Sequence, residues 1–314
     1  MTDSRRPARE ADPTIPRVAV IIVTYNSATV LDDCLSSLRP TGVDLKTVVV
    51  ADNGSRDDSL MIAKSATDLP MLTVDLGRNA GYAAAINAGI DAIDVAGLDA
   101  IMVLNPDCMV RPDTIAVMWR ALCKPGRGIA VPRLLNPDGT LQPSLRRLPT
   151  VRRAIAEAVL GARAGHIGSL GELIADPARY AEPGPAAWAT GAAMLISTEA
   201  MASIGPWDES FLLYSEETEY ALRAADKGWT LWYEPAAVVE HAGGESGTSP
   251  RLAALVIVNK IALFRRRHRF PTTAAFYLVV LLGESVRALT GRRIARAAVV
   301  ALLRPVRHTR VLAD

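Results

Sequence analysis

Four short clusters of polar residues hold most of the side chains in this sequence that could do chemistry. Each cluster follows a run of apolar, mostly β-branched residues, as expected just beyond the end of a buried strand. The clusters are Thr24, Tyr25 and Asn26; Asp52, Asn53, Gly54 and Ser55; Asn79 and Gly81; and Asn105, Pro106 and Asp107. Because the carboxyl ends of parallel strands meet at one edge of a sheet, the four clusters predict a single site.

Asp107 is the candidate metal ligand of this site. It follows a strand and a proline, so its carboxylate is expected to project from a rigid turn at the sheet edge. Hard oxygen donors favour Mg²⁺ or Mn²⁺, and such a cation stabilises the charge that develops on a departing diphosphate. The alternative is an ordinary surface turn.

The other clusters fit a nucleotide. Asp52 comes directly after a buried run, where a carboxylate can accept the imide N–H of uracil or thymine; an Asx-turn is the alternative. Thr24 and Tyr25 are expected to line the same pocket. Asn79 is expected to be a helix N-cap, which leaves backbone N–H groups free for a diphosphate; capping alone is the alternative. Gly81 then allows the diphosphate to approach the backbone closely, and Arg78 supplies a positive charge to the phosphates.

The elements that must position these residues alternate between strands and helices. Strands are expected at 18–24, 47–51, 71–75 and 100–104, with helices at 27–38, from 57, at 80–93 with a possible interruption at Gly89, and at 112–122. This order predicts an α/β fold with a mainly parallel, Rossmann-like sheet flanked by helices. A second ordered block is expected at 188–241, with a helix at 216–227. For the segment between 136 and 180 the sequence predicts no chemistry.

Composition and charge divide the chain into three parts. Half of the 314 residues are apolar, enough for a substantial core, and three widely spaced cysteines suggest neither disulfides nor a zinc site. Residues 1–250 hold 22 basic and 31 acidic residues, whereas residues 251–314 hold 13 basic and 2 acidic. We expect a flexible tail at 1–16 without a secretory signal, a catalytic domain at 17–250 with halves at 17–135 and 136–250, and a basic helical extension at 251–314.

The motifs, in their order, resemble the inverting GT-A glycosyltransferases of family 2 over about residues 17–245. They are VAVIIVTYNS at 18–27, VVVADNGSRDDS at 48–59, GRNAGYAAAINAG at 77–89, LNPD at 104–107, TGAAMLI at 190–196, WDESFLLYSEETEYALRA at 207–224 and EPAAVVEH at 234–241. The NPD triplet, the TGAAMLI block and the basic tail look most like bacterial rhamnosyltransferases, in particular the actinobacterial ones that act on decaprenyl-diphospho-N-acetylglucosamine.

This resemblance implies roles for further residues. His241 takes the position of a histidine that completes the metal shell, and Asn105 replaces the first acid of the DxD motif of the family. Glu217 matches the general base, with Glu216 as the alternative because the register is uncertain by one; both also suit a first helical turn as partners of its dipole. Asp208 and Glu209 are expected to hold acceptor hydroxyls. Trp207 is either a sugar platform or a buried anchor.

The extension contains two apolar stretches, 252–264 and 273–282. Both are shorter than the roughly 20 residues of a membrane span. Arginines border them at Arg265, Arg266, Arg267 and Arg269 and at Arg287, Arg292, Arg293 and Arg296. We expect helices in the interface of an anionic membrane, with arginines on head groups or a lipid diphosphate. The alternatives are a homo-oligomer interface or a helical cover; a nucleic-acid partner is not expected, because the arginines lack interleaved aromatics.

The resulting hypothesis is an enzyme at the cytoplasmic face of the plasma membrane. Its partners are a nucleoside-diphosphate sugar such as dTDP-rhamnose and a polyprenyl-diphosphate-linked sugar acceptor, and its cofactor is Mg²⁺ or Mn²⁺. The alternative is a scaffold on the same fold that binds nucleotide or carbohydrate without catalysis, which the Asn105 and Glu217 departures keep open. A nucleotidyltransferase should carry a GxG loop after the first strand, where this chain has TYNS.

Overall fold

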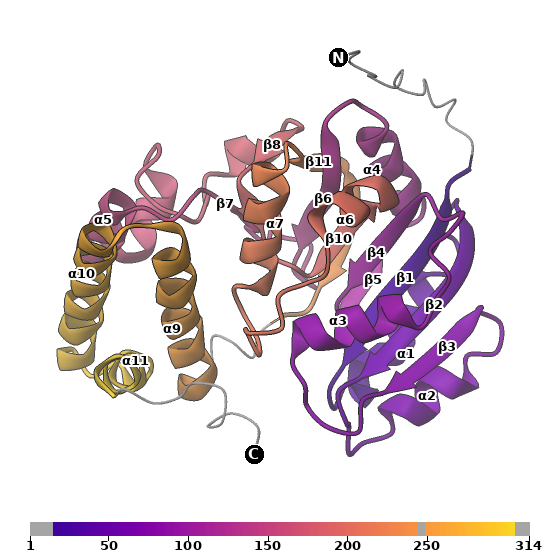
Figure 1. Ribbon diagram of the computed structural model, residues 1–314, viewed down its shortest axis with the longest axis horizontal. Helices are drawn as coiled ribbons and strands as arrows, with labels where there is room; N and C mark the ends of the chain where they lie inside the picture. The colour runs from indigo at the N-terminus through magenta and orange to yellow at the C-terminus, as the bar shows by residue number, and fades with distance from the viewer. Residues whose placement is uncertain (1–14, 244–248, 305–314) are drawn as a thin grey trace, which may run out of the picture.

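The computed structural model describes residues 15–243 and 249–304 of the chain (Figure 1). Residues 1–14 of the predicted tail, 244–248 and 305–314 lie outside the described residues. The strands and helices of the first half are β1 Arg17–Thr24, α1 Ala28–Ser37, β2 Asp44–Asp52, α2 Ser59–Ser65, β3 Met71–Asp75, α3 Tyr82–Asp91, β4 Ala100–Leu104, β5 Cys108–Val110, α4 Thr114–Leu122 and β6 Arg127–Leu135.

The second half adds shorter strands and the C-terminal helices. Its elements are β7 Leu145–Arg146, α5 Val151–Leu160, two 3₁₀ turns at Gly161–His166 and Pro177–Tyr180, β8 Gly184–Ala186, β9 Trp188–Ala189, β10 Ala193–Ser197, α6 Thr198–Ile204, α7 Glu216–Asp226, β11 Thr230–His241, α9 Pro250–Arg267, α10 Phe270–Leu289 and α11 Arg293–Leu303.

The central sheet has the strand order β3-β2-β1-β4-β10-β6-β11-β5, and β8 pairs with β11. Strands β3, β2, β1 and β4 run parallel to their neighbours, which confirms the predicted parallel sheet of the first half. Strand β10 runs antiparallel to both β4 and β6, whereas β6 and β11 are parallel. Because β10 is reversed, the chain enters it at the edge where β4 ends, and the backbone N–H of Asn105 donates to the carbonyl of Ala192 at 2.8 Å. The loop before β10 therefore lies beside the predicted site.

The central strands of the sheet are buried on both faces. Residues 18–22 of β1 and 100–104 of β4 are almost completely buried, because helices cover both faces of the sheet (Figure 1). Helix α3 is continuous through Gly89, contrary to the suggested interruption: a Cβ at this position would come within 2.8 Å of the Ile21 side chain, so glycine brings the helix close to the sheet. Helix α4 begins at Thr114 rather than at 112, because Asp113 before it has a left-handed backbone with φ of 62°.

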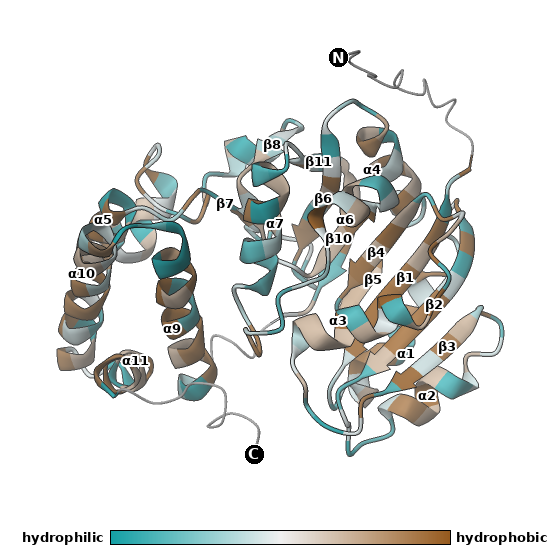
Figure 2. Cartoon of the chain, viewed as in Figure 1, coloured by the Kyte–Doolittle hydropathy of each residue, from teal (hydrophilic) through white to brown (hydrophobic). Residues whose placement is uncertain are grey.

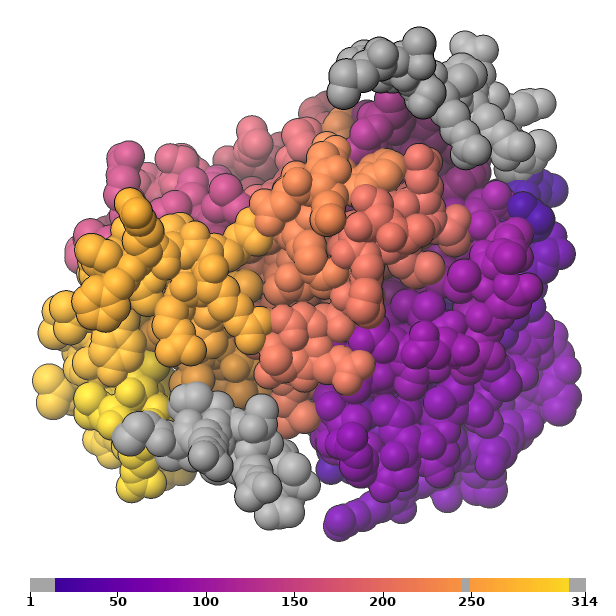
Figure 3. Space-filling view, viewed as in Figure 1, coloured from indigo at the N-terminus to yellow at the C-terminus, as the bar shows by residue number. Residues whose placement is uncertain are grey.

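The C-terminal helices form a separate group at one end of the molecule, and α5 packs among them (Figure 1). Phe264 of α9 stacks on Phe276 of α10, with ring centroids 3.9 Å apart, and Ala154 of α5 joins this cluster. The ammonium group of Lys260 lies 2.6 Å from Glu172 and 3.5 Å from Glu157 of α5. Helix α5 thus ties the extension to the rest of the chain. In the view of Figure 3 the surface of the extension lies at one end of the molecule, and the orange and salmon surface lies between it and the N-terminal half.

The helices of the extension are longer than their apolar stretches suggested. Helix α9 has 18 residues, and α10 has 20 and is long and apolar enough to cross a membrane by length and composition. The predicted apolar stretch ended at Leu282, but α10 continues because Gly283 packs against α5 and Glu284 pairs with Arg287 at 2.7 Å. The expectation that both segments are too short to span is therefore wrong for α10.

Candidate active site

Asp107 and His241 meet at the edge of the sheet. Asp107 follows β4, His241 is the last residue of β11, and β11 pairs with β5, so His241 lies opposite Cys108. His241 Nε2 is 3.4 Å from Asp107 Oδ1 and also 3.4 Å from the amide nitrogen of Asn105. Burial acts to raise the pKa of Asp107, but the hydrogen bond and charge of His241 and the N–H of Gly243 outweigh it and hold that pKa below its ordinary value.

A group that could hold a metal ion consists of Asp107, Cys108 and His241, whose ligand atoms lie within 4.8 Å of one another. Cys108 is an unsuitable ligand, because burial raises the pKa of its thiol well above the ordinary value and its sulfur is 3.4 Å from the carbonyl of Ala192. The carboxylate of Asp107 and the imidazole of His241 remain. An oxygen and a nitrogen donor, with the other positions open, fit a divalent cation that shares its shell with a diphosphate.

Tyr82, the first residue of α3, connects this end of the site with the carboxylates of α7. Its hydroxyl donates to Asn105 Oδ1 at 2.7 Å and lies 3.2 Å from the carbonyl oxygen of Gly191. Burial, followed by the charges of Glu216, Cys108, Glu217 and Asp107, raises the pKa of Tyr82 well above its ordinary value. The charges of all three carboxylates therefore act on one phenol.

Glu216 and Glu217 begin helix α7 inside the protein. Tyr214 and Ser215 before them both have left-handed backbones, with φ of 68° and 78°, a conformation that costs free energy in non-glycine residues and recurs at functional sites. Burial and the adjacent Glu217 raise the pKa of Glu216 well above its ordinary value. Burial also raises the pKa of Glu217, where the positive charge of Arg146 opposes it.

The side chain of Glu217 lies in a gap that a glycine leaves open. A Cβ at Gly191 would be 3.1 Å from the Cβ of Glu217, so a larger residue between the loop before β10 and α7 would crowd the Glu217 side chain. One carboxyl oxygen of each glutamate is buried with no hydrogen-bond partner in the described part of the chain, as is Nε of Arg146. Buried polar atoms without partners point to a ligand that is not in the structure.

The predicted base-binding residues form one buried network. The carboxylate of Asp52 accepts hydrogen bonds from Thr24 Oγ1 at 2.6 Å and from the N–H and hydroxyl of Ser55 at 2.7 and 2.6 Å. Asp52 thus makes the Asx-type turn that was its alternative role. Asn26 accepts from the N–H of Arg56 at 2.8 Å, and Tyr25 beside it is half exposed.

The predicted diphosphate turn is built differently from the expectation. The N-cap of α3 is Gly81, not Asn79, whose side chain instead accepts from the N–H of Gly81 at 3.2 Å. Gly81 is required because φ is +101° and a Cβ would come within 2.6 Å of the carbonyl of Leu212. Asn53 fixes the turn through its amide, which accepts from the N–H of Ala80 at 3.1 Å, and Arg78 is exposed beside it.

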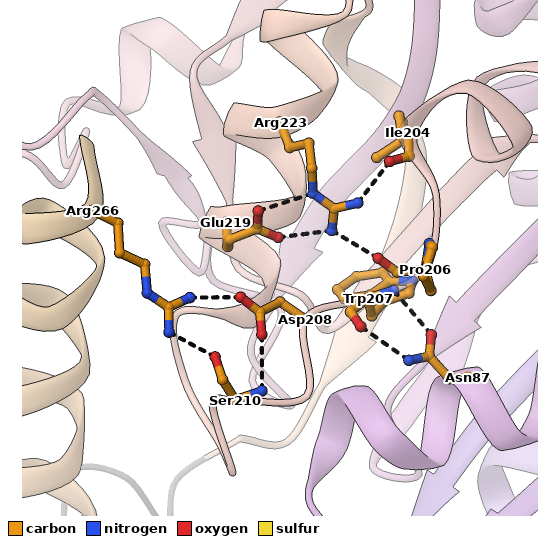
Figure 4. A network of polar contacts seen from close by, with 9 residues as sticks. All are labelled: Asn87, Ile204, Pro206, Trp207, Asp208, Ser210, Glu219, Arg223 and Arg266. Carbon is orange, nitrogen blue, oxygen red and sulfur yellow. Dashed lines mark hydrogen bonds and ion pairs between the residues drawn. The ribbon is translucent and has the colours of Figure 1, made fainter.

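The predicted acceptor residues make contacts within the protein, and Figure 4 shows those of Trp207 and Asp208. Trp207 is 3% exposed and stacks on Tyr220 with ring centroids 4.2 Å apart, so it is the buried anchor. Asp208 pairs with Arg266 of α9 at 2.6 Å, and Glu209 accepts from the amide of Asn87 at 2.9 Å. The WDES segment therefore joins α3, α7 and the extension.

Three residues of the site were missed in the sequence: Tyr82, Gln142 and Arg146. Gln142 contacts His241, and Arg146 lies near Glu217. Along the segment after β6, residues 142, 144 and 146 alternate as they do on one face of an extended chain. That alternation was the available signal, but nothing local shows that the face meets β11 and α7.

Comparison with known proteins gives similarities to glycosyltransferases. Residues 19–163 match the family described as Glycosyl transferase family 2. An N-acetylglucosaminyl-diphospho-decaprenol L-rhamnosyltransferase of Mycobacterium tuberculosis is 29% identical over 244 residues, which cover 74% of this chain and 78% of that protein. The low-salt glycan biosynthesis hexosyltransferase Agl10 of Haloferax volcanii is 29% identical over 208 residues, 66% of this chain and 61% of that protein.

Solved structures confirm the predicted fold. The mannosyltransferase PcManGT from Pyrobaculum calidifontis, in complex with GDP-Man and Mn²⁺, has a TM-score of 0.57 at 18% identity and covers 94% of this chain and 82% of its own. TarS of S. aureus in complex with UDP-GlcNAc has a TM-score of 0.51 at 15% identity and covers 91% and 89%.

Proposed function

The chain is a glycosyltransferase of the family 2 type, with its family domain at residues 19–163, and we propose that it transfers L-rhamnose from dTDP-rhamnose to a polyprenyl-diphosphate-linked sugar. The likeness to the mycobacterial rhamnosyltransferase supports this donor and acceptor. The observation that carries the proposal is the position of Tyr82, whose hydroxyl contacts Asn105 beside the metal end and the carbonyl of Gly191, the residue that packs against Glu217. This phenol therefore connects a metal end with a base end.

Asp107 and His241 are the residues that we propose hold the metal, Mg²⁺ or Mn²⁺. When bound, the cation neutralises part of the charge on the diphosphate leaving group. Asn105 lies beside both residues, and its amide joins them to Tyr82. The chain thus supplies one carboxylate where the DxD motif has two, and His241 provides the second protein ligand.

Glu217 is the base that we propose for the transfer. It takes the proton of the acceptor hydroxyl while the acceptor oxygen forms a bond to the anomeric carbon, the bond to the diphosphate oxygen breaks on the opposite face, and the configuration inverts. Glu217 suits this role better than Glu216, because Glu216 is only 3% exposed whereas Glu217 is partly exposed. Arg146 favours the ionised form of Glu217 that a base requires.

The nucleotide occupies the edge next to Asp52 in this proposal. Thr24 and Ser55 fix the carboxylate, and Tyr25 and Asn26 border it at the end of β1. Asn53, Asn79, Gly81 and Arg78 shape the neighbouring turn, where the diphosphate would lie between the base and the metal end.

The helical extension provides the membrane surface. Leu278, Leu282, Val286 and Leu289 recur at helical spacing on α10 and are between 54% and 87% exposed, and α10 is apolar along most of its length (Figure 2). Arg292, Arg293 and Arg296 are exposed just beyond this stripe. An apolar face with neighbouring cations fits the interface of an anionic bilayer on the cytoplasmic side.

An interfacial position suits α10 better than a span. Arg287 donates to the carbonyl of Glu157 at 3.2 Å, so a spanning α10 would pull α5 into the bilayer. Two arginines that were expected to reach lipid are engaged with the catalytic domain: Arg266 pairs with Asp208 and Arg267 with Asp226. They hold α9 to that domain instead.

Membrane binding is tested by sedimentation with vesicles of phosphatidylglycerol and of phosphatidylcholine. The wild type should bind the anionic vesicles, and the double variant Leu282→Glu/Val286→Glu should not. Met61→Glu is the matched control, because Met61 is 62% exposed on α2 in the N-terminal half. Equal binding by all three proteins would refute the membrane surface.

The transfer reaction is tested by measuring dTDP release from dTDP-rhamnose with and without a polyprenyl-diphospho-N-acetylglucosamine acceptor. Release should require both acceptor and Mn²⁺ or Mg²⁺, and Asp107→Ala should abolish it while the protein remains folded. The exposed Glu182→Gln serves as the control for the loss of an acidic group. Metal-independent release, or full activity of Asp107→Ala, would contradict the proposal and favour a different site.

A further inference from the structure

A tight turn brings residues 136–142 next to His241. After β6 the N–H of Asn136 donates to the carbonyl of Thr140 at 2.8 Å, and the N–H of Gln142 donates back to Leu134 at 2.9 Å. Because β6 and β11 are parallel, with Leu135 opposite Glu240, the turn lies at the end of β11. Gln142 is therefore held beside the last residue of that strand.

Gln142 contacts His241 through both ends of its amide. Its Oε1 is 2.6 Å from Nδ1 of the imidazole, and its Nε2 donates to the carbonyl of His241 at 3.2 Å. The same Nε2 donates to Asn136 Oδ1 at 2.9 Å. With both N–H groups used, the oxygen of the amide faces the ring and can only accept.

The direction of these hydrogen bonds is fixed by a carboxylate at the far end. Asp138 Oδ1 accepts from the hydroxyl of Thr140 at 2.6 Å, so that hydroxyl can accept in turn from the amide nitrogen of Asn136 at 2.9 Å. Asn136 then presents its oxygen to Gln142, and Gln142 presents its oxygen to His241. An ionised carboxylate accepts but never donates, so the relay runs in one sense only.

The other face of the ring meets groups of both kinds. The amide oxygen of Asn105 accepts from Tyr82, which turns the amide nitrogen toward His241 Nε2 at 3.4 Å. The carboxylate of Asp107 lies 3.4 Å from the same Nε2 and would accept a proton there. The contact with Gln142 is therefore the one that favours the proton on Nδ1.

We propose that Gln142 is a positioning residue that keeps His241 in the tautomer with hydrogen on Nδ1, and that the Asn136–Thr140 turn sets its direction. The inference rests on the proposed function, in which His241 binds the metal. A ligating imidazole needs a free lone pair and a hydrogen-bond acceptor on its second nitrogen. Without Gln142 the proton can move to Nε2, where Asp107 would accept it, and the metal end would be blocked.

The direct test is the tautomer of His241, read from ¹⁵N spectra of histidine-labelled protein at about pH 8, where an ordinary imidazole is neutral. The chain has four histidines, so His241→Gln assigns the signal. The wild type should show hydrogen on Nδ1, Gln142→Leu should shift it to Nε2, and Gln142→Glu should keep it on Nδ1, because a carboxylate also accepts. An Nδ1 proton that persists in Gln142→Leu, or an Nε2 proton in the wild type, would overturn the inference.

Titration of the protein with Mn²⁺ alone, followed by electron paramagnetic resonance, separates this inference from the proposed function. Gln142→Leu should bind Mn²⁺ about 10 to 100 times more weakly, the usual effect of losing an outer partner of a ligand, and Gln142→Glu should restore binding. Weaker binding by His241→Gln together with wild-type binding by Gln142→Leu would sink the inference alone. Wild-type binding by His241→Gln would instead sink the metal assignment in the proposed function.

Discussion

Tyr82→Phe removes a hydroxyl that joins the metal end of the site to the loop before β10. The substitution leaves the ring in place but deprives Asn105 Oδ1 of its donor at 2.7 Å and Gly191 of a contact at 3.2 Å. A buried polar group left without its partner costs about 1–3 kcal/mol. We therefore expect the free energy of unfolding to fall by about 2 kcal/mol, seen as a lower urea midpoint with an unchanged slope.

The kinetic effect of Tyr82→Phe should follow from the same loss. Asn105 is then free to turn, so its amide no longer holds its place beside Asp107 and His241, and we expect kcat/KM for transfer to fall about tenfold, equivalent to about 1.4 kcal/mol. Tyr277→Phe is the matched control: its hydroxyl donates to Leu302 in the extension at 3.0 Å, so it should lower stability slightly and leave kcat/KM unchanged. Wild-type stability and wild-type kcat/KM in Tyr82→Phe would refute the bridging role.

Three further predictions concern charge and packing. Arg146→Gln removes the charge that lowers the pKa of Glu217, so the acidic limb of the kcat profile, where the base must be ionised, should move to higher pH. Gly89→Ala should lower the free energy of unfolding by about 1–3 kcal/mol through overpacking against the sheet. A double-mutant cycle on Arg266 and Asp208 should give a coupling of only about 0.2–1 kcal/mol in urea unfolding, because the pair is partly exposed.

Each of these has an outcome that contradicts it. An acidic limb that stays in place or moves to lower pH in Arg146→Gln would show that the charge of Arg146 does not lower the pKa of Glu217. Stability equal to that of Gly184→Ala, where a Cβ meets open space, would show that α3 does not need glycine at 89. A coupling free energy well above the expected range would mean that Arg266 and Asp208 interact as strongly as a buried ion pair.

Local pattern predicted the elements whose neighbours are close in sequence. Strands β1 to β4 were found within a few residues of their observed bounds, because buried parallel strands are continuous apolar runs between helices. The reversal of β10 was not predictable, since an apolar run carries no direction. The length of α10 was underestimated because its charged residues, Glu284 and Arg287, neutralise each other and remain in the helix.

Site residues that follow or end a strand in a recognisable motif were predicted. Site residues whose role depends on contacts far along the chain were missed. Asp107 and His241 were named from motifs, and the structure brings them together. Gln142 lies 99 residues before His241, and Tyr82 lies 109 residues before Gly191, so no local periodicity marks either one. For Trp207 the sequence left a sugar platform and a buried anchor open, because an aromatic residue in a polar motif fits either role until its stacking partner, Tyr220, is known.

The central claim is that a base on α7 and a metal end at Asp107 act together on one sugar. Its most direct measurement is the rate of sugar transfer to acceptor by Glu217→Gln and Glu216→Gln at saturating donor and Mn²⁺. We predict that Glu217→Gln loses about 10²–10⁴ in rate, the contribution of a general base, while binding dTDP and Mn²⁺ as the wild type does, and that Glu216→Gln retains most activity. A wild-type rate in Glu217→Gln would contradict the account.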